Sequence, residues 1–143
     1  MNYSFIYDVI PGRVVFGAGS RRSLREEASQ LGSERVLVIA SPEEDALAED
    51  VQSILGDLVV GRFSDVVQHV PVSKAREAIL AVREGRADTI VTVGGGSATG
   101  FGKAISLETE VKSIALPTTY AGSEMTTIWG LTDGDRKQTG KDP

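Results

Sequence analysis

The segment TIVTVGGGS, residues 89–97, constrains the fold more than any other part of the chain. A short β-branched stretch runs directly into three glycines and a serine that can begin a helix. Glycines let the main chain approach an anion closely, and the free N–H groups of the first helical turn point at it from the positive end of the helix dipole. The segment predicts a strand–turn–helix unit that holds phosphate, so a nucleotide or phosphorylated ligand is the first hypothesis.

An alternation of strand and helix extends along most of the chain. A continuous apolar stretch predicts a strand buried on both faces at 36–39. Further strands are predicted at 58–63, where Gly61 weakens the pattern, at the β-branched stretch 89–93 and at 113–116. Amphipathic stretches predict helices at 21–31, about 42–55, 73–84 and 98–107. Ser41 stands at the N-cap of the second helix in a capping-box arrangement, Ser41-Pro42-Glu43-Glu44, and Ser73 stands at the N-cap of the third. The pattern predicts an α/β, Rossmann-like parallel sheet flanked by helices, with ligands at the carboxyl ends of its strands.

The two ends of the chain do not follow this alternation. Stretches 5–7 and 13–16 flank the turn pair Pro11-Gly12 and predict an N-terminal hairpin. After Pro117 one more strand is predicted at 125–132, followed by a turn at 133–134. The last ten residues are polar and predict no terminal element. We therefore expect a chain cut from a longer protein.

Composition narrows the classes of function. The 143 residues include no cysteine and a single histidine, so we expect no metal site in this chain. Fifteen basic residues are spread along a chain of net charge −5, which argues against a nucleic-acid partner. No apolar run approaches the ~18 residues that span a bilayer, and the N-terminus lacks a secretory pattern. A cytoplasmic protein without a membrane partner is expected.

The glycine turn does not match either of two common nucleotide-binding motifs. The motif G-x-G-x-x-G would need a glycine at Thr99. The phosphate-loop motif would need a glycine at Ser97 and a serine or threonine at Ala104. On the residues alone, a tight turn without a ligand stays open.

Two segments together resemble the iron-containing alcohol dehydrogenase family. They are GGGSATGFGK, residues 94–103, and PTTYAGSE, residues 117–124, and each follows a predicted strand. Most members carry an aspartate at the position of Gly100, and the maleylacetate reductases of that family resemble this chain in lacking it. An aspartate there would repel a dicarboxylate substrate, by about 1 kcal/mol or more at ~4 Å. The resemblance implies reduction of maleylacetate to 3-oxoadipate, in aromatic-compound breakdown, with NADH or NADPH.

The resemblance also implies roles for particular residues. The cofactor-binding set is Gly94, Gly95, Gly96, Ser97, Thr118, Thr119, Ser41, Ser123 and Lys137. Ser41 stands where many relatives place an aspartate that repels a 2′-phosphate, so use of both NADH and NADPH is expected. No catalytic residue is expected in this chain, although His69 is a candidate on the substrate side. Its alternative reading is a solvated loop histidine, and Lys103 is either a surface lysine or part of the site. Phe101 and Trp129 are expected in the core or at a domain interface.

The proteins that this chain resembles are more than twice its length, so we expect their helical second domain to be missing from it. Residues 1–143 are therefore expected to form the N-terminal NAD(P)-binding domain of a two-domain enzyme, inactive as a fragment. The implied partners are the cofactor, a small dicarboxylate substrate bound with the missing domain, and a second copy in a homodimer. Two alternatives stay open. One is a family member acting on an alcohol or aldehyde, against which Gly100 argues, and the other is a non-catalytic nucleotide-binding module.

Overall fold

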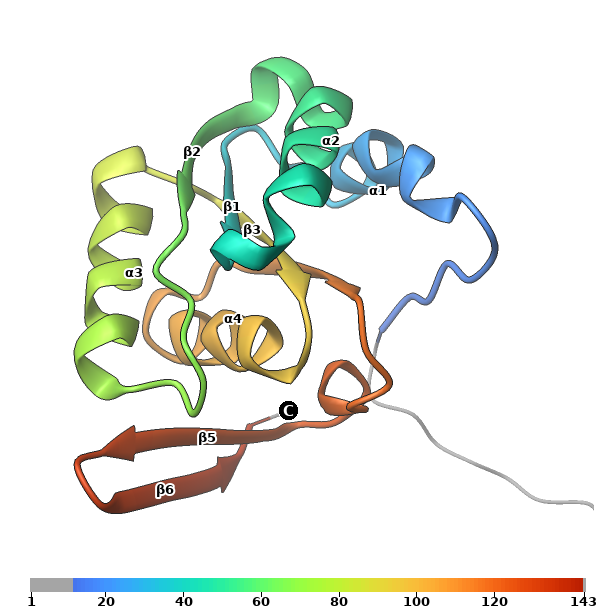
Figure 1. Ribbon diagram of the computed structural model, residues 1–143. Coiled ribbons are helices and arrows are strands. Elements are labelled where there is room, and N and C mark those ends of the chain that lie inside the picture. Colours follow the sequence, from blue (N-terminus) through green and yellow to red (C-terminus); the bar gives the residue numbers. More distant parts are fainter. Residues whose placement is uncertain (1–11, 143) are drawn as a thin grey trace, which may run out of the picture.

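The computed structural model describes residues 12–142 and has a parallel sheet at its centre (Figure 1). Its strands lie in the order β2-β1-β3-β4. They are β1 Val36–Ala40, β2 Val59–Phe63, β3 Thr89–Gly94 and β4 Lys112–Pro117. Every residue of β1 and β3 is buried, as expected for the two middle strands of a parallel sheet that is covered on both faces. The predicted α/β fold is confirmed.

Helices cover both faces of this sheet. They are α1 Leu24–Gln30, α2 Asp45–Leu55, α3 Val72–Gly85 and α4 Gly96–Thr109. α1 and α2 pack on one face around Val38 and Val51, and α3 and α4 pack on the other around Ile39 and Phe101. The chain thus leaves β1 towards one face and the adjacent β3 towards the other. This divergence is a topological switch point, the place where open α/β sheets bind ligands.

The predicted helix starts were partly wrong. Ser41 precedes a 3-10 turn, Pro42–Glu44, and its side chain makes no capping hydrogen bond; the α-helix begins only at Asp45. α3 begins at Val72 with Pro71 at its N-cap, so Ser73 lies inside the helix. α4 begins at Gly96, two residues before the predicted start. In each case the local sequence placed the helix correctly and missed its first turn.

The C-terminal part of the described chain forms an antiparallel hairpin of β5 Ile128–Asp133 and β6 Arg136–Lys141. The strand predicted at 125–132 is present as β5, although it begins three residues later. The expectation that the last ten residues form no element was wrong, because they contain β6. β6 is exposed along nearly its whole length, so its sequence, RKQTGK, carries no apolar alternation. The hairpin runs alongside α4 (Figure 1), and Leu131 reaches the core around α3 and α4.

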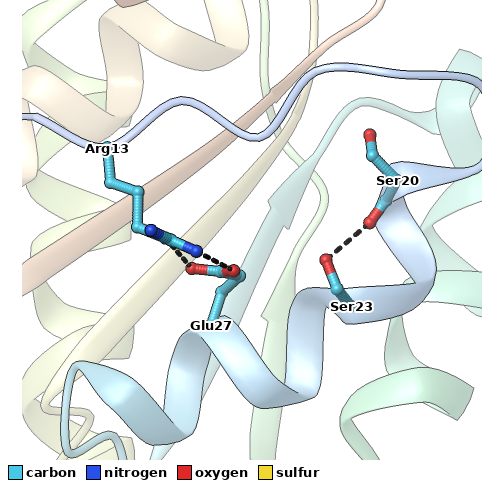
Figure 2. A network of polar contacts seen from close by, with 4 residues as sticks. All are labelled: Arg13, Ser20, Ser23 and Glu27. Atoms are coloured by element: carbon cyan, nitrogen blue, oxygen red, sulfur yellow. Dashed lines mark hydrogen bonds and ion pairs between the residues drawn. The ribbon is translucent and has the colours of Figure 1, made fainter.

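The N-terminal segment is tied to α1 by side chains. Residues 12–16 form no strand, so this half of the predicted hairpin was wrong, and residues 5–7 lie outside the described part. Arg13 Nε donates to Glu27 Oε2 at 2.7 Å, and Ser23 Oγ donates to the Ser20 carbonyl at 2.8 Å (Figure 2). Phe16 is 92% exposed. Its apolar surface is therefore left uncovered by residues 12–142.

The structure places the two aromatic residues Phe101 and Trp129 in different surroundings. Phe101 is fully buried, and its ring centroid lies 5.9 Å from that of Phe63, so its core position is confirmed. Trp129 is half-buried on β5 opposite Gly140 of β6. Of the helices within residues 12–142, none has the length and apolar character needed to cross a membrane.

Candidate functional site

The predicted site residues gather at the carboxyl edge of the sheet. The register pairs Ala40 of β1 with Val93 of β3, and Gly94 of β3 with Pro117 of β4. Ser41, the glycine turn and the threonines after Pro117 therefore follow three adjacent strand ends. Sequence positions more than seventy residues apart meet at one edge, as the parallel topology requires.

The glycine turn has no room for side chains. Gly94 has a φ of 143°, which L side chains rarely adopt, and a Cβ there would lie 3.0 Å from the Ala98 Cβ. A Cβ on Gly95 would lie 3.1 Å from Thr119 Oγ1. Close packing of Thr119 against Gly95 explains why the backbone itself forms the surface of this turn.

The N-terminus of α4 is open to a ligand. Gly95 occupies the N-cap, no side chain of residues 12–142 caps the helix, and its first turn carries no acidic residue. Thr99 N–H donates to the Gly95 carbonyl at 3.2 Å. The N–H groups of Gly96, Ser97 and Ala98 precede the first helical hydrogen bond, so they are available to an anion.

A cleft of about 480 Å³ opens beside this helix end. Among the residues that line it are Gly96, Ser97, Ser123 and Lys137, all from the predicted cofactor-binding set, and His69. The volume lies within the range of small-molecule sites, ~300–1,000 Å³. The other predicted residues do not line this cleft and lie at or just after the ends of β1, β3 and β4: Ser41, Gly94, Gly95, Thr118 and Thr119. The predicted residues thus form one continuous edge with two parts.

Lys103 belongs to the cleft wall. Its Nζ donates to the Ile128 carbonyl at 2.6 Å and to Thr126 Oγ1 at 3.2 Å. Burial lowers the pKa of the Lys103 ammonium, and the Glu124 carboxylate opposes that shift. Lys103 is half-buried and fastens the start of β5 to α4, which favours its reading as part of the site. Lys137, on exposed β6, is the second cation of the cleft.

The loop of residues 64–71 brings His69 to the cleft in an unusual backbone conformation. His69 and Val70 have φ values of 65° and 44°, a region that is rare for a β-branched residue. Val70 is buried, and its Cγ2 lies 2.8 Å from where a Cβ on Gly100 would stand. The Val70 carbonyl accepts from Thr132 N–H at 3.1 Å. Gly100 therefore has a steric reason to lack a side chain, whichever substrate the protein binds.

Glu44 contacts a predicted site residue, and this contact was not predicted from the sequence. Its carboxylate accepts a hydrogen bond from Thr118 Oγ1 at 2.8 Å, although the two residues lie far apart in the sequence. The capping-box pattern gave Glu44 a local explanation, so no signal remained to suggest this contact. Beside it, the Glu43 backbone N–H and then the Ser41 hydroxyl lower the pKa of the Glu43 carboxyl.

Metal ligands do not gather in the part of the chain that the structure describes. No group of three histidine, cysteine, aspartate or glutamate side chains there could hold an ion. Residues 12–142 therefore do not supply a ligand set that fits a metal ion.

Comparisons with known proteins agree with this geometry. Maleylacetate reductase 1 of Cupriavidus pinatubonensis is 48% identical over 139 residues, which is 97% of this chain and 39% of that protein. Maleylacetate reductase of Burkholderia cepacia is 50% identical over 139 residues, 97% of this chain and 40% of that protein. The chain thus spans about two fifths of the length of these relatives.

Solved structures show the same likeness. The crystal structure of maleylacetate reductase from Agrobacterium tumefaciens matches with a TM-score of 0.92 and 45% identity, over 99% of this chain and 40% of that one. Sulfoacetaldehyde reductase from Bifidobacterium kashiwanohense, solved in complex with NAD+, shares the fold with a TM-score of 0.86 at 22% identity, over 97% of this chain and 44% of that one. The family model described as iron-containing alcohol dehydrogenase matches residues 11–142. The chain belongs to the iron-containing alcohol dehydrogenase family.

Proposed function

We propose that residues 1–143 form the NAD(P)-binding domain of an NAD(P)H-dependent maleylacetate reductase. The observation that carries the proposal is the uncapped N-terminus of α4 behind a glycine turn, at the switch point of a parallel sheet. The maleylacetate reductases that are 48% and 50% identical to this chain support the choice of substrate. The fold shared with a reductase solved in complex with NAD+ supports the choice of cofactor.

In this proposal the backbone holds the cofactor pyrophosphate. The turn of Gly94, Gly95, Gly96 and Ser97 presents main chain without obstruction, and the free N–H groups of Gly96 and Ser97 in the first turn of α4 donate to the pyrophosphate oxygens. Lys137 adds positive charge from the cleft, and Ser123 lines the same wall. The bound nicotinamide would supply the hydride, while the domain's task is to place it.

The remaining candidate residues flank the pyrophosphate position. Thr118 and Thr119 follow β4 and offer hydroxyls at the same edge, and Ser41 follows β1. His69 lines the cleft and is the candidate for contact with the dicarboxylate substrate. Gly100 keeps a carboxylate away from that substrate. We expect the substrate pocket to be completed by residues outside this chain, in a cytoplasmic homodimer that uses NADH or NADPH.

Cofactor titration tests the proposal. We expect NADH or NADPH to bind the natural full-length protein in a fluorescence titration, and maleylacetate to be reduced at the expense of the bound cofactor. A Gly95→Val variant should weaken cofactor binding at least tenfold, because the new side chain displaces Thr119 and covers the turn. Ser29→Val, on the exposed surface of α1, is the matched control. Absence of cofactor binding by the folded full-length protein would refute the proposal.

A further inference from the structure

The cleft beside α4 carries a charge opposite to that of the chain as a whole. The chain has 20 acidic and 15 basic residues. Among residues 12–142, those that line the cleft include Lys103, Lys137 and His69 but no aspartate or glutamate. Cations without carboxylates beside them attract an anion into a cleft. The cleft therefore suits anionic groups beyond the one expected at the N-terminus of α4.

Lys103 is held in the cleft wall without being neutralised. The two oxygens that its ammonium contacts, the Ile128 carbonyl at 2.6 Å and Thr126 Oγ1 at 3.2 Å, are both uncharged. None of the ion pairs formed within the described range, 12–142, includes Lys103. Burial lowers the pKa of the ammonium, and the Glu124 carboxylate opposes that shift without pairing with it. The half-buried charge thus has a desolvation cost that a bound anion would offset.

The Lys103 ammonium keeps one donor for a ligand. A lysine ammonium has three N–H groups, and Thr126 and Ile128 accept from two of them. These two hydrogen bonds also fix the side chain, so little conformational entropy is lost when the third N–H donates. Gly100 stands one turn earlier on the same face of α4, and it has no side chain that could occupy this position.

Lys103 is separate from the position proposed for the pyrophosphate. It follows Gly96, the first residue of α4, by seven residues. That separation is about 10 Å along the helix axis, at a rise of ~1.5 Å per residue. The ammonium is bonded to Ile128 at the start of β5 rather than to the first turn of α4. The cleft thus offers two positions to anions, one made of backbone N–H groups and one made of a side-chain ammonium.

We propose that Lys103 binds one carboxylate of the dicarboxylate substrate while the N-terminus of α4 holds the cofactor. The inference rests on the proposed function and names a substrate-binding residue for it. A hydrogen bond between an ammonium and a carboxylate is about twice as strong as one between neutral groups. A ligand with a neutral group at this place leaves the ammonium without a counter-charge. Lys103 therefore selects for an anion at one end of the substrate.

The test measures cofactor and dicarboxylate binding separately on the natural full-length protein. NADH and NADPH are titrated by fluorescence. Adipate, a dicarboxylate without a carbon–carbon double bond, is titrated by calorimetry with the tighter-binding cofactor present at saturation.

Four variants separate the charge of Lys103 from its structural contacts. Lys103→Gln removes the charge. Thr126→Asp keeps the lysine and its attachment but neutralises the ammonium with an adjacent carboxylate, and Thr126→Asn is its uncharged counterpart. Lys112→Gln is the control for a lost cation, because Lys112 Nζ donates to the Gly32 carbonyl at the start of β4, at the opposite edge of the sheet.

We expect adipate to bind the wild type. Lys103→Gln and Thr126→Asp should each raise its dissociation constant at least tenfold, as the loss of a charge-assisted hydrogen bond predicts. Thr126→Asn and Lys112→Gln should change it less than threefold. The cofactor dissociation constants should stay within threefold of the wild type in all four variants.

An adipate dissociation constant that either Lys103→Gln or Thr126→Asp leaves unchanged would overturn the inference. A wild type that binds cofactor but no adipate would overturn it as well. Equal weakening of cofactor and adipate by Lys103→Gln would also count against it, because the lysine would then serve the fold or the cofactor. If Lys103→Gln does not fold, Thr126→Asp decides alone. A wild type that binds neither NADH nor NADPH would instead refute the proposed function.

Discussion

Gly100 offers the sharpest test of how the cleft is built. Alanine in place of glycine within a helix normally stabilises it by about 0.5–1 kcal/mol. Here the new Cβ would lie 2.8 Å from Val70 Cγ2, closer than carbon atoms can approach. Overpacking of a buried contact costs about 1–3 kcal/mol. We expect Gly100→Ala to lower the free energy of unfolding by about 0.5–2 kcal/mol, since the steric cost exceeds the helix gain.

Val70 has little freedom to move away from the new methyl group. Its side chain has one rotatable bond, its φ is 44°, and its carbonyl accepts from Thr132 N–H. The second variant, Val70→Ala, removes the clashing atom. In urea unfolding followed by circular dichroism, Gly100→Ala should cost less in the Val70→Ala background than in the wild type, by about 1 kcal/mol or more. Equal costs in both backgrounds, or a Gly100→Ala variant more stable than the wild type, would refute the steric reasoning.

The same series separates the two explanations of Gly100 in the proposed enzyme. Gly100→Ala adds bulk without charge, whereas Gly100→Asp adds both. If repulsion of a dicarboxylate matters, the aspartate variant should raise KM for maleylacetate well beyond the alanine variant. An unchanged KM in Gly100→Asp would count against the electrostatic explanation.

Two further variants probe the rest of the fold. Gly140→Ala would place a Cβ 2.5 Å from Trp129 Cζ2, so we expect the β5–β6 hairpin to open. The fluorescence of the single tryptophan should then shift to longer wavelength. An unchanged spectrum would show that the indole is free to move away from the new methyl group. The Asp88 carboxylate accepts from the backbone N–H groups of Glu34 and Arg35 at 2.9 and 3.1 Å. Burial raises the pKa of Asp88, but hydrogen bonds from Thr89 and these N–H groups lower it more. Its contribution to stability is therefore full above the unfolded pKa of about 4 and is lost as pH falls through the lower folded value. Asp88→Asn should flatten the loss of stability in acid unfolding curves, and a curve parallel to the wild type would contradict this.

The parts of the fold that the sequence predicted are those with a local cause. β1 and β3 are buried on both faces, so β1 is continuously apolar and β3 consists mostly of β-branched residues, which are easy to recognise. The glycine turn was predicted because a backbone site for an anion needs glycines wherever it occurs. β6 was missed because an exposed strand held by main-chain hydrogen bonds has no apolar period.

The missed site features depend on contacts between distant segments. Glu44 looked like a capping residue, and only the folded sheet brings Thr118 within hydrogen-bonding distance of it. The left-handed backbone at His69 and Val70 depends on space left by Gly100, thirty residues further on. The sequence leaves Lys103 open as a surface lysine or a site residue, because the Ile128 carbonyl that binds its ammonium lies 25 residues away in the chain.

The hydrogen bond between the Val70 carbonyl and Thr132 N–H has a mechanical consequence. This bond is part of the parallel bridge between Pro71 and Thr132, and Lys103 binds the Ile128 carbonyl, so the hairpin is joined to the loop of His69 on one side and to α4 on the other. Three walls of the cleft are thus linked through the hairpin. We expect a ligand that displaces the hairpin to displace the loop of His69 as well.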